Sequence, residues 1–196
     1  MVDDRSGKYS GYEPAEGEQA RTLQSFNFAA AELRAEISLF WQRSLFFWGF
    51  IAASFVGYGV LIKESDKDLA LVVACFGFAC SVAWTLANRG SKYWQVAWEQ
   101  KLKSVEKAAL GEDFYSRDEK NIDQHWWGAV RYSVTRLTIA MSDLSVLIWI
   151  ALGVKAFPMG QGASGSFAEI ILVAGTYFYV LWMVFKGLSE RSKNSN

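Results

Sequence analysis

Residue types that build catalytic and metal sites are scarce in this sequence. Its 196 residues include one histidine, two cysteines and two prolines. His125 has no metal-ligand partner at a useful spacing and no nucleophile to activate, so we expect no catalytic residues, no metal and no cofactor. Cys75 and Cys80 fall in one apolar run, and residues five apart on a helix cannot form a disulfide. We expect both cysteines to pack as small apolar side chains.

The sequence also lacks a net charge and, over its first residues, the pattern of a cleavable signal peptide. The chain has 20 basic and 20 acidic residues, and this balance gives no general attraction to nucleic acid, which we do not expect as a partner. Residues 1–19 are polar and lack the basic-then-apolar order of a signal peptide. We therefore expect the first apolar run to be retained and to direct its own insertion.

What the sequence does contain is four long apolar runs, at residues 44–62, 69–87, 137–154 and 168–185. A helix needs about 20 apolar residues to cross the ~30 Å hydrocarbon layer of a bilayer. The first two runs contain no charged residue, whereas the last two contain one each, Asp143 and Glu169. Short linkers join the runs in pairs. The pattern predicts an all-α integral membrane protein with four transmembrane helices in two hairpins.

Positive charge is distributed unevenly between the segments that connect the runs. All but three of the 20 lysines and arginines lie in the N-terminal arm, in the segment between the two hairpins or in the tail. By the positive-inside rule, that segment and both termini lie in the cytoplasm. Basic residues at the cytoplasmic span ends, and a tryptophan pair before the third span, are typical of membrane anchors. These anchors are Arg43, Arg89, Trp126, Trp127 and Lys186.

Two amphipathic segments extend the first hairpin into the cytoplasm. Residues 18–42 and 91–110 place apolar side chains at spacings of three and four, which is typical of one apolar stripe along a helix. A single pair of helices has little interior, so we expect neighbouring subunits of a homo-oligomer to cover the stripes. The candidate contact residues are Leu33, Ile37, Trp94, Trp98, Leu102 and Val105.

These patterns divide the chain into five segments. We expect residues 1–17 to be a disordered arm and residues 18–111 to form the first hairpin with its long cytoplasmic helical extensions. A cytoplasmic and interfacial connector at 112–136 precedes the second hairpin at 137–186. Residues 187–196 form a cytoplasmic tail.

Asp143 is the most unusual residue of the spans, because a carboxylate near the middle of a bilayer costs roughly 2.5–3.5 kcal/mol. Thr138, Ser142 and Ser145 lie on neighbouring faces of the same helix, and Arg136 lies two turns below Asp143 and can lean towards it. Two interpretations are open. In one, Asp143 and these residues line a hydrated pathway. In the other, Asp143 stays protonated and joins helices through hydrogen bonds.

A row of small residues in the second run predicts a close helix contact, since small side chains let helix backbones approach one another. The row includes Ala70, Ala74, Gly77 and Ser81, and Gly49, Ala53 and Gly57 give a similar row in the first run. Packing within the first hairpin is favoured over a contact between subunits.

Two stretches resemble a bacterial membrane-protein family. They are residues 88–95 (NRGSKYWQ), followed by Trp98, Glu99, Leu102 and Glu106, and residues 132–142 (YSVTRLTIAMS). They are similar to the RipA family of octameric inner-membrane proteins, and to small octameric membrane pores that accompany RNA-targeting CRISPR systems. The resemblance covers residues 23–186 and implies a homo-octamer in the bacterial inner membrane. An Arg-x4–6-His nuclease-like motif of some pore-forming members has no match, because seven residues separate Arg117 from His125.

Taken together, these features predict a non-enzymatic, homo-oligomeric inner-membrane assembly that acts as a pore or membrane-integrity effector in stress or defence. A first alternative is a membrane scaffold that recruits a cytoplasmic protein without conducting. A second is a small-solute or proton-coupled transporter that uses Asp143, although no broken helices or inverted repeats are visible.

Overall fold

The computed structural model describes residues 16–111, 133–157 and 165–193, with side chains in 17–111, 133–157 and 167–187. Several sequence predictions lie outside the described residues. They concern His125, the anchors Trp126 and Trp127, most of the N-terminal arm and most of the connector.

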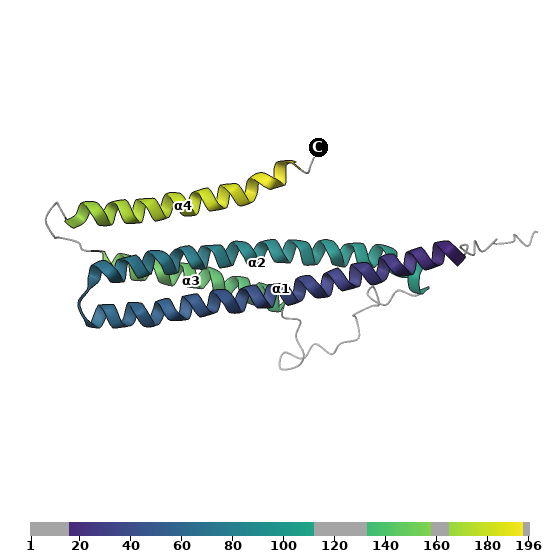
Figure 1. The fold of residues 1–196 in the computed structure, drawn as a ribbon, viewed down its shortest axis with the longest axis horizontal. Helices are drawn as coiled ribbons and strands as arrows, with labels where there is room; N and C mark the ends of the chain where they lie inside the picture. Colours follow the sequence, from purple (N-terminus) through teal and green to yellow (C-terminus); the bar gives the residue numbers. More distant parts are fainter. Residues whose placement is uncertain (1–15, 112–132, 158–164, 194–196) are drawn as a thin grey trace, which may run out of the picture. The chain divides into compact units, whose positions relative to one another are not determined.

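Four helices account for nearly all of the described residues: α1 (Glu16–Lys63), α2 (Lys67–Leu110), α3 (Val134–Ala156) and α4 (Gly165–Lys193) (Figure 1). Each contains a stretch that is long and apolar enough to cross a membrane. The described part of the chain contains no strand. The predicted all-α membrane architecture with four spans is therefore confirmed.

The first two helices are longer than a bilayer requires. At ~1.5 Å per residue, the 48 residues of α1 and the 44 of α2 reach roughly 66–72 Å, more than twice the ~30 Å of hydrocarbon. Both run without interruption past the ends of their apolar runs, so the amphipathic segments are continuous with the spans. α4 likewise continues to Lys193, into the segment that we predicted to be a tail.

The chain divides into two compact units. Residues 1–34 and 96–122 form the first, which we call the extension unit. Residues 35–95 and 123–196 form the second, which we call the membrane unit. α1 and α2 contribute to both.

In the extension unit, α1 and α2 pair through a small apolar core. Two alanines on α1 face Leu102 on α2, and Leu102 is completely covered. Phe28 meets the ring of Trp98 edge-on, with 6.0 Å between the ring centroids. Part of the stripe that we assigned to subunit contacts is therefore already buried inside the chain. The core consists of Ala29, Ala30 and Leu102, with Phe26, Leu33 and Trp98 packed against it.

Polar residues set the helix starts in the membrane unit. Between α1 and α2, Ser65 has a left-handed backbone with φ 64°. The carboxylate of Asp66 then accepts the backbone N–H of Leu69 at 3.1 Å, which satisfies a free donor in the first turn of α2. At the start of α3, the hydroxyl of Ser133 accepts the N–H of Arg136 at 3.4 Å in the same way.

Trp149 of α3 fills the centre of the membrane unit. Its ring stacks on Phe55 of α1 at 4.4 Å between centroids and meets Tyr58 edge-on at 6.1 Å. The hydroxyl of Tyr58 donates to the carbonyl of Leu152 at 2.9 Å and ties α1 to α3. On α2, Gly77 leaves so little space that an added Cβ would overlap the Trp149 ring. At Gly77 the small-residue row of α2 thus receives a side chain from α3, whereas Ala70 and Ala74 share a buried cluster with Tyr58 of α1, as expected for packing within the first hairpin. In α1, an added Cβ at Gly49 or Gly57 would meet nothing within 4 Å, so these two glycines make no close helix contact within the chain.

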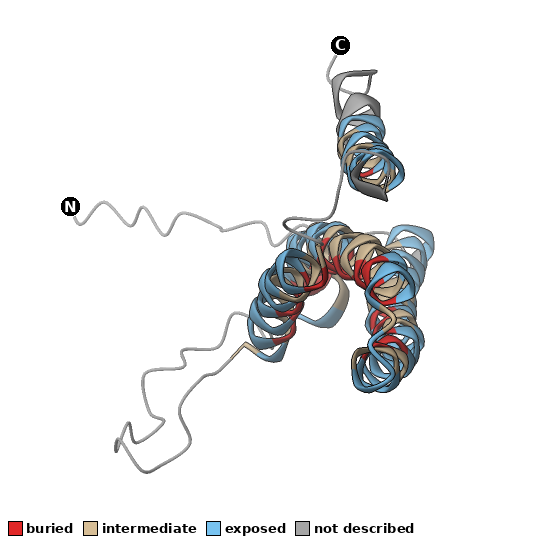
Figure 2. Ribbon diagram, turned by 90° about the vertical axis from the view of Figure 1, so that its left-hand side faces the viewer, coloured by how far each residue is buried: buried red, intermediate tan, exposed pale blue. Residues whose placement is uncertain are grey.

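Apolar residues cover the outer sides of the helices, and buried residues follow their facing sides (Figure 2). Large side chains such as Phe46, Val56, Leu147 and Phe178 are well exposed. In water such a surface would be unstable, whereas lipid or further subunits accept it without cost.

Candidate functional site: a polar layer and a surface ion pair in the membrane unit

The buried residues of α2 change from small or apolar to mainly polar along the helix. Beyond Gly77, towards Lys67, the buried residues are small or apolar. In the other direction, towards the end at which α1 and α2 continue into the extension unit, they are polar except for Trp84. We call that end the extension side. The polar side chains and their partners form what we call the polar layer: Glu36, Arg43, Ser44, Ser81, Thr85, Asn88, Ser91, Gln95, Thr135 and Ser145.

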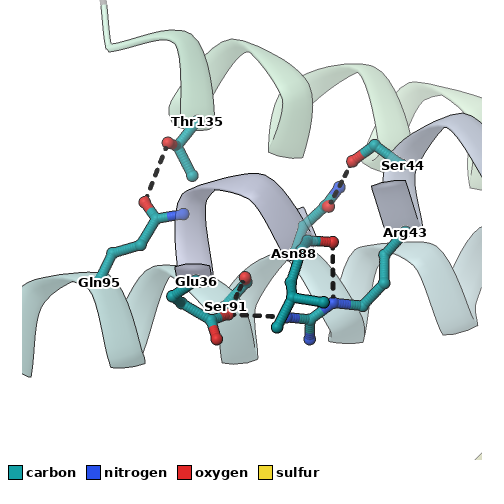
Figure 3. A network of polar contacts seen from close by, with 8 residues as sticks. Glu36, Arg43, Ser44, Asn88, Ser91, Gln95 and Thr135 are labelled. Atoms are coloured by element: carbon teal, nitrogen blue, oxygen red, sulfur yellow. Dashed lines mark hydrogen bonds and ion pairs between the residues drawn. The ribbon is translucent and has the colours of Figure 1, made fainter. Parts of the chain in front are cut away.

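Glu36 links α1 to α2 in this layer (Figure 3). Its carboxylate accepts Nη2 of Arg43 at 2.8 Å and also the hydroxyl of Ser91. The Glu36 side chain is only 15% exposed, so this carboxylate is stabilised by partners from two helices. Arg43, which we predicted to be a membrane anchor, is held in place by Glu36 and by the carbonyl of Leu39 at 3.1 Å.

One turn further into the membrane unit, Ser44 and Asn88 make a second link between α1 and α2. The Ser44 hydroxyl donates to Oδ1 of Asn88 at 3.3 Å and accepts the indole N–H of Trp84 at 3.4 Å. Asn88 is 2% exposed, and its Nδ2 has no hydrogen-bond partner among the described residues. The same holds for the hydroxyl of Thr85. Interhelical bonds of this kind contribute about 0.6 kcal/mol each in membranes.

α3 joins the layer from the other side. The hydroxyls of Ser81 and Ser145 are 2.8 Å apart and both residues are buried. Nearer the extension side, the Thr135 hydroxyl donates to Oε1 of Gln95 at 3.5 Å (Figure 3). With Trp149 against Gly77, these contacts define an antiparallel pairing of α2 and α3.

An ion pair lies on the surface of the same α2–α3 pair. Nη2 of Arg89 is 3.1 Å from Oδ2 and 3.3 Å from Oδ1 of Asp143. The Arg89 and Asp143 side chains are 59% and 44% exposed. Exposed apolar residues lie near Asp143 on α3, with Leu147 one turn further along the same face and Leu144 on the neighbouring one. Two charges are therefore displayed on a surface that is otherwise built for lipid.

The structure separates the predicted polar path into two faces. Thr138, Ser142 and Ser145 are buried, because residues three and four apart share one side of a helix. The hydroxyls of Thr138 and Ser142 bond carbonyls of their own helix, Val134 at 3.0 Å and Ile139 at 2.8 Å. Asp143 follows Ser142 by one residue, about 100° around the helix, and therefore points elsewhere.

Arg136 is exposed, and the partner of Asp143 is Arg89. The sequence places Arg136 two turns from Asp143 on one helix, a relation that can be seen without a structure. Arg89 is 54 residues away on another helix, so its role depends on how α2 and α3 align. We had assigned Arg89 to the membrane anchors only.

Of the residues predicted to contact other subunits, some are covered within the chain and others are exposed. Leu102 is buried in the core of the extension unit, and Leu33, Trp98 and Val105 are half-buried. Ile37 and Trp94 are 43% and 53% exposed and remain open to contact with another copy. Of the other predicted anchors, Lys186 lies with its ammonium 5.0 Å from the ring of Trp182.

The described residues contain no group of three or more His, Cys, Asp or Glu side chains that could hold a metal ion. Cys75 and Cys80 are both free thiols within α2.

Four membrane-length helices, of which α1, α2 and α3 are joined by hydrogen bonds, with exposed apolar side chains on their outer sides, define a polytopic α-helical membrane protein. The model of the Octameric membrane protein family (8xMP) matches residues 23–158, and the chain belongs to this family. The match confirms the octameric membrane family expected from the sequence. It includes Arg89, Asp143 and the whole polar layer, and it ends before α4. No curated protein and no solved structure matches the chain.

Proposed function

We propose that the chain assembles as an octameric pore in the bacterial inner membrane, with the Arg89–Asp143 ion pair facing a water-filled lumen. The observation that supports this proposal is a half-exposed ion pair on an apolar surface. The octameric state follows from the family to which the chain belongs.

The position of Asp143 within α3 argues against lipid as its surroundings. It lies 13 residues before the end of α3 at Ala156, which is roughly 20 Å along a helix and well inside a ~30 Å hydrocarbon layer. A charge at such a depth costs roughly 2.5–3.5 kcal/mol in contact with lipid. Charged residues in spans therefore face a bundle interior or a water-filled cavity. Here the interior of the chain is excluded, because both side chains are exposed.

Symmetry then favours a lumen. In a ring of identical copies, each copy turns the same face towards the axis. If that face contains the ion pair, eight pairs surround one opening and all of them are hydrated. The remaining exposed surface of the spans is apolar and suits lipid and neighbouring copies.

In this proposal the extensions of α1 and α2 lie in the cytoplasm, as the distribution of lysine and arginine indicates. Exposed Ile37 and Trp94 contact neighbouring copies near the membrane surface. The assembly has no enzymatic activity, and it acts by changing membrane permeability during stress or defence.

Current across a planar bilayer tests the pore. We expect purified wild-type octamer to give discrete openings, and Asp143→Asn to change their conductance because it alters the charge on the lumen wall. Glu99→Gln is the matched control, since Glu99 pairs with Lys103 at 3.0 Å on the surface of the extension unit. Intact octamers without current under every voltage and tension applied would instead indicate a scaffold. Saturable uptake without discrete openings would indicate a transporter.

A further inference from the structure

The Arg89–Asp143 pair contains one positive and one negative charge at hydrogen-bond distance, and this balance has a consequence for ion selection. Both carboxylate oxygens of Asp143 lie within 3.3 Å of the same guanidinium nitrogen. Charged rings select ions in many channels because they attract one sign and repel the other. A ring of paired charges attracts and repels ions only weakly, because the negative charge of each carboxylate is offset by the guanidinium beside it.

We infer that Arg89 determines the ion selectivity of the pore by neutralising the ring of Asp143 carboxylates. This inference rests on the proposed pore. In the wild-type assembly the two rings offset one another, and the lumen distinguishes weakly between cations and anions. Removal of one partner leaves eight charges of the other sign without compensation.

Arg89 is the described cation that pairs with Asp143, and the other nearby charges are the same in every variant compared. Arg136 lies seven residues before Asp143 on α3, roughly 10 Å along the helix, whereas charges in ~0.15 M salt are screened over about 8 Å. Lys92 lies one turn beyond Arg89, on the extension side. In the other direction, the next charged residue of α3 is Lys155, at the far end of the helix. Asp143 is therefore the only described carboxylate of α3, and Arg89 is its described partner.

The direction of the effect differs between the two single variants. Arg89→Gln leaves a ring of carboxylates, which favours cations. Asp143→Asn leaves a ring of guanidinium groups, which favours anions. The double variant Arg89→Gln/Asp143→Asn contains neither ring and should again discriminate weakly. No common loss of stability produces opposite shifts in two variants and their cancellation in the third, so the pattern identifies electrostatic compensation.

The experiment is a reversal-potential measurement across a KCl gradient with octamers of each variant in planar bilayers. We expect the potassium-to-chloride permeability ratio to rise about fivefold or more in Arg89→Gln and to fall by a similar factor in Asp143→Asn. Lys103→Gln and Glu99→Gln break an ion pair of similar length in the extension unit and should leave the ratio unchanged. If Arg89→Gln fails to assemble, the inference requires weak selectivity in the wild type together with chloride selectivity in the nearly isosteric Asp143→Asn; a cation-selective wild type that becomes unselective in Asp143→Asn would overturn it.

The outcomes separate this inference from the pore itself. Currents whose permeability ratio is the same in wild type, Arg89→Gln and Asp143→Asn would overturn the role of Arg89 and leave the pore intact. Shifts of the same sign in both single variants would also overturn it. Intact octamers of every variant that pass no current would overturn the pore, and the inference with it.

Discussion

Replacing Gly77 by leucine should detach α3 from the first hairpin. An added Cβ at this position would overlap three ring atoms of Trp149, and the obstacle is a rigid indole held between Phe55 and Tyr58. Overfilling a well-packed core typically costs about 1–3 kcal/mol, and a leucine adds four carbon atoms at a contact that has no space for the first of them. We expect Gly77→Leu to lower the thermal unfolding midpoint in detergent by more than any other single glycine substitution in the spans.

Two further variants make this result specific. Gly59→Leu, at an exposed glycine of α1 whose added Cβ meets nothing within 4 Å, should leave the midpoint nearly unchanged. Adding Trp149→Ala to Gly77→Leu removes the obstructing ring and should recover part of the loss, although Trp149→Ala alone costs about 3–5 kcal/mol. Equal thermal unfolding midpoints for Gly77→Leu and Gly59→Leu would show that the Trp149 ring of α3 does not pack against Gly77.

Leu102→Glu should open the helix pair of the extension unit. Leu102 is completely buried against Ala29 and Ala30, so the variant places a carboxylate where a leucine fills an apolar core. Burying an unpaired charge costs several kcal/mol, and even Leu102→Ala should cost about 2–5 kcal/mol. Among the described residues of this unit, the buried core consists of three apolar residues, so we expect the helix pair to separate rather than adjust.

Amide hydrogen exchange measures the effect directly. In Leu102→Glu, protection should fall in residues 18–34 and 96–110 and persist in the spans. Leu23→Glu places the same charge on a residue of the same unit that is 43% exposed, and should leave protection in place. Full protection in Leu102→Glu would contradict the described core. Loss of the octamer in Leu102→Glu but not in Leu23→Glu would further indicate that the paired extensions are needed for assembly.

Sequence periodicity was sufficient to find the elements of this fold. Each of the four apolar runs and each of the two amphipathic stripes lies within a single helix. Their positions can therefore be found from the spacing of residues along the sequence alone. The resemblance at residues 88–95 and 132–142 also identified the octameric family, which the match over 23–158 confirms.

Contacts between helices could not be found in that way. Two such contacts are the packing of the Trp149 ring on Gly77 and the ion pair between Arg89 and Asp143. Both depend on how α2 and α3 are aligned, and the spacing of residues within either helix does not contain that information. The sequence offered Arg136 as a neighbour of Asp143 because both are on one helix. It also assigned Leu102 to a contact between subunits, since a stripe does not reveal whether its own hairpin partner covers it.

In the proposed pore, the Arg89–Asp143 pair faces an aqueous lumen on the axis of a ring of eight copies. Imaging of the purified assembly in lipid nanodiscs tests it most directly. We expect eightfold symmetry, a continuous axial opening through the membrane, and Arg89 and Asp143 on its wall. A closed axis filled by apolar side chains, or an ion pair enclosed between two neighbouring copies away from any opening, would contradict the claim.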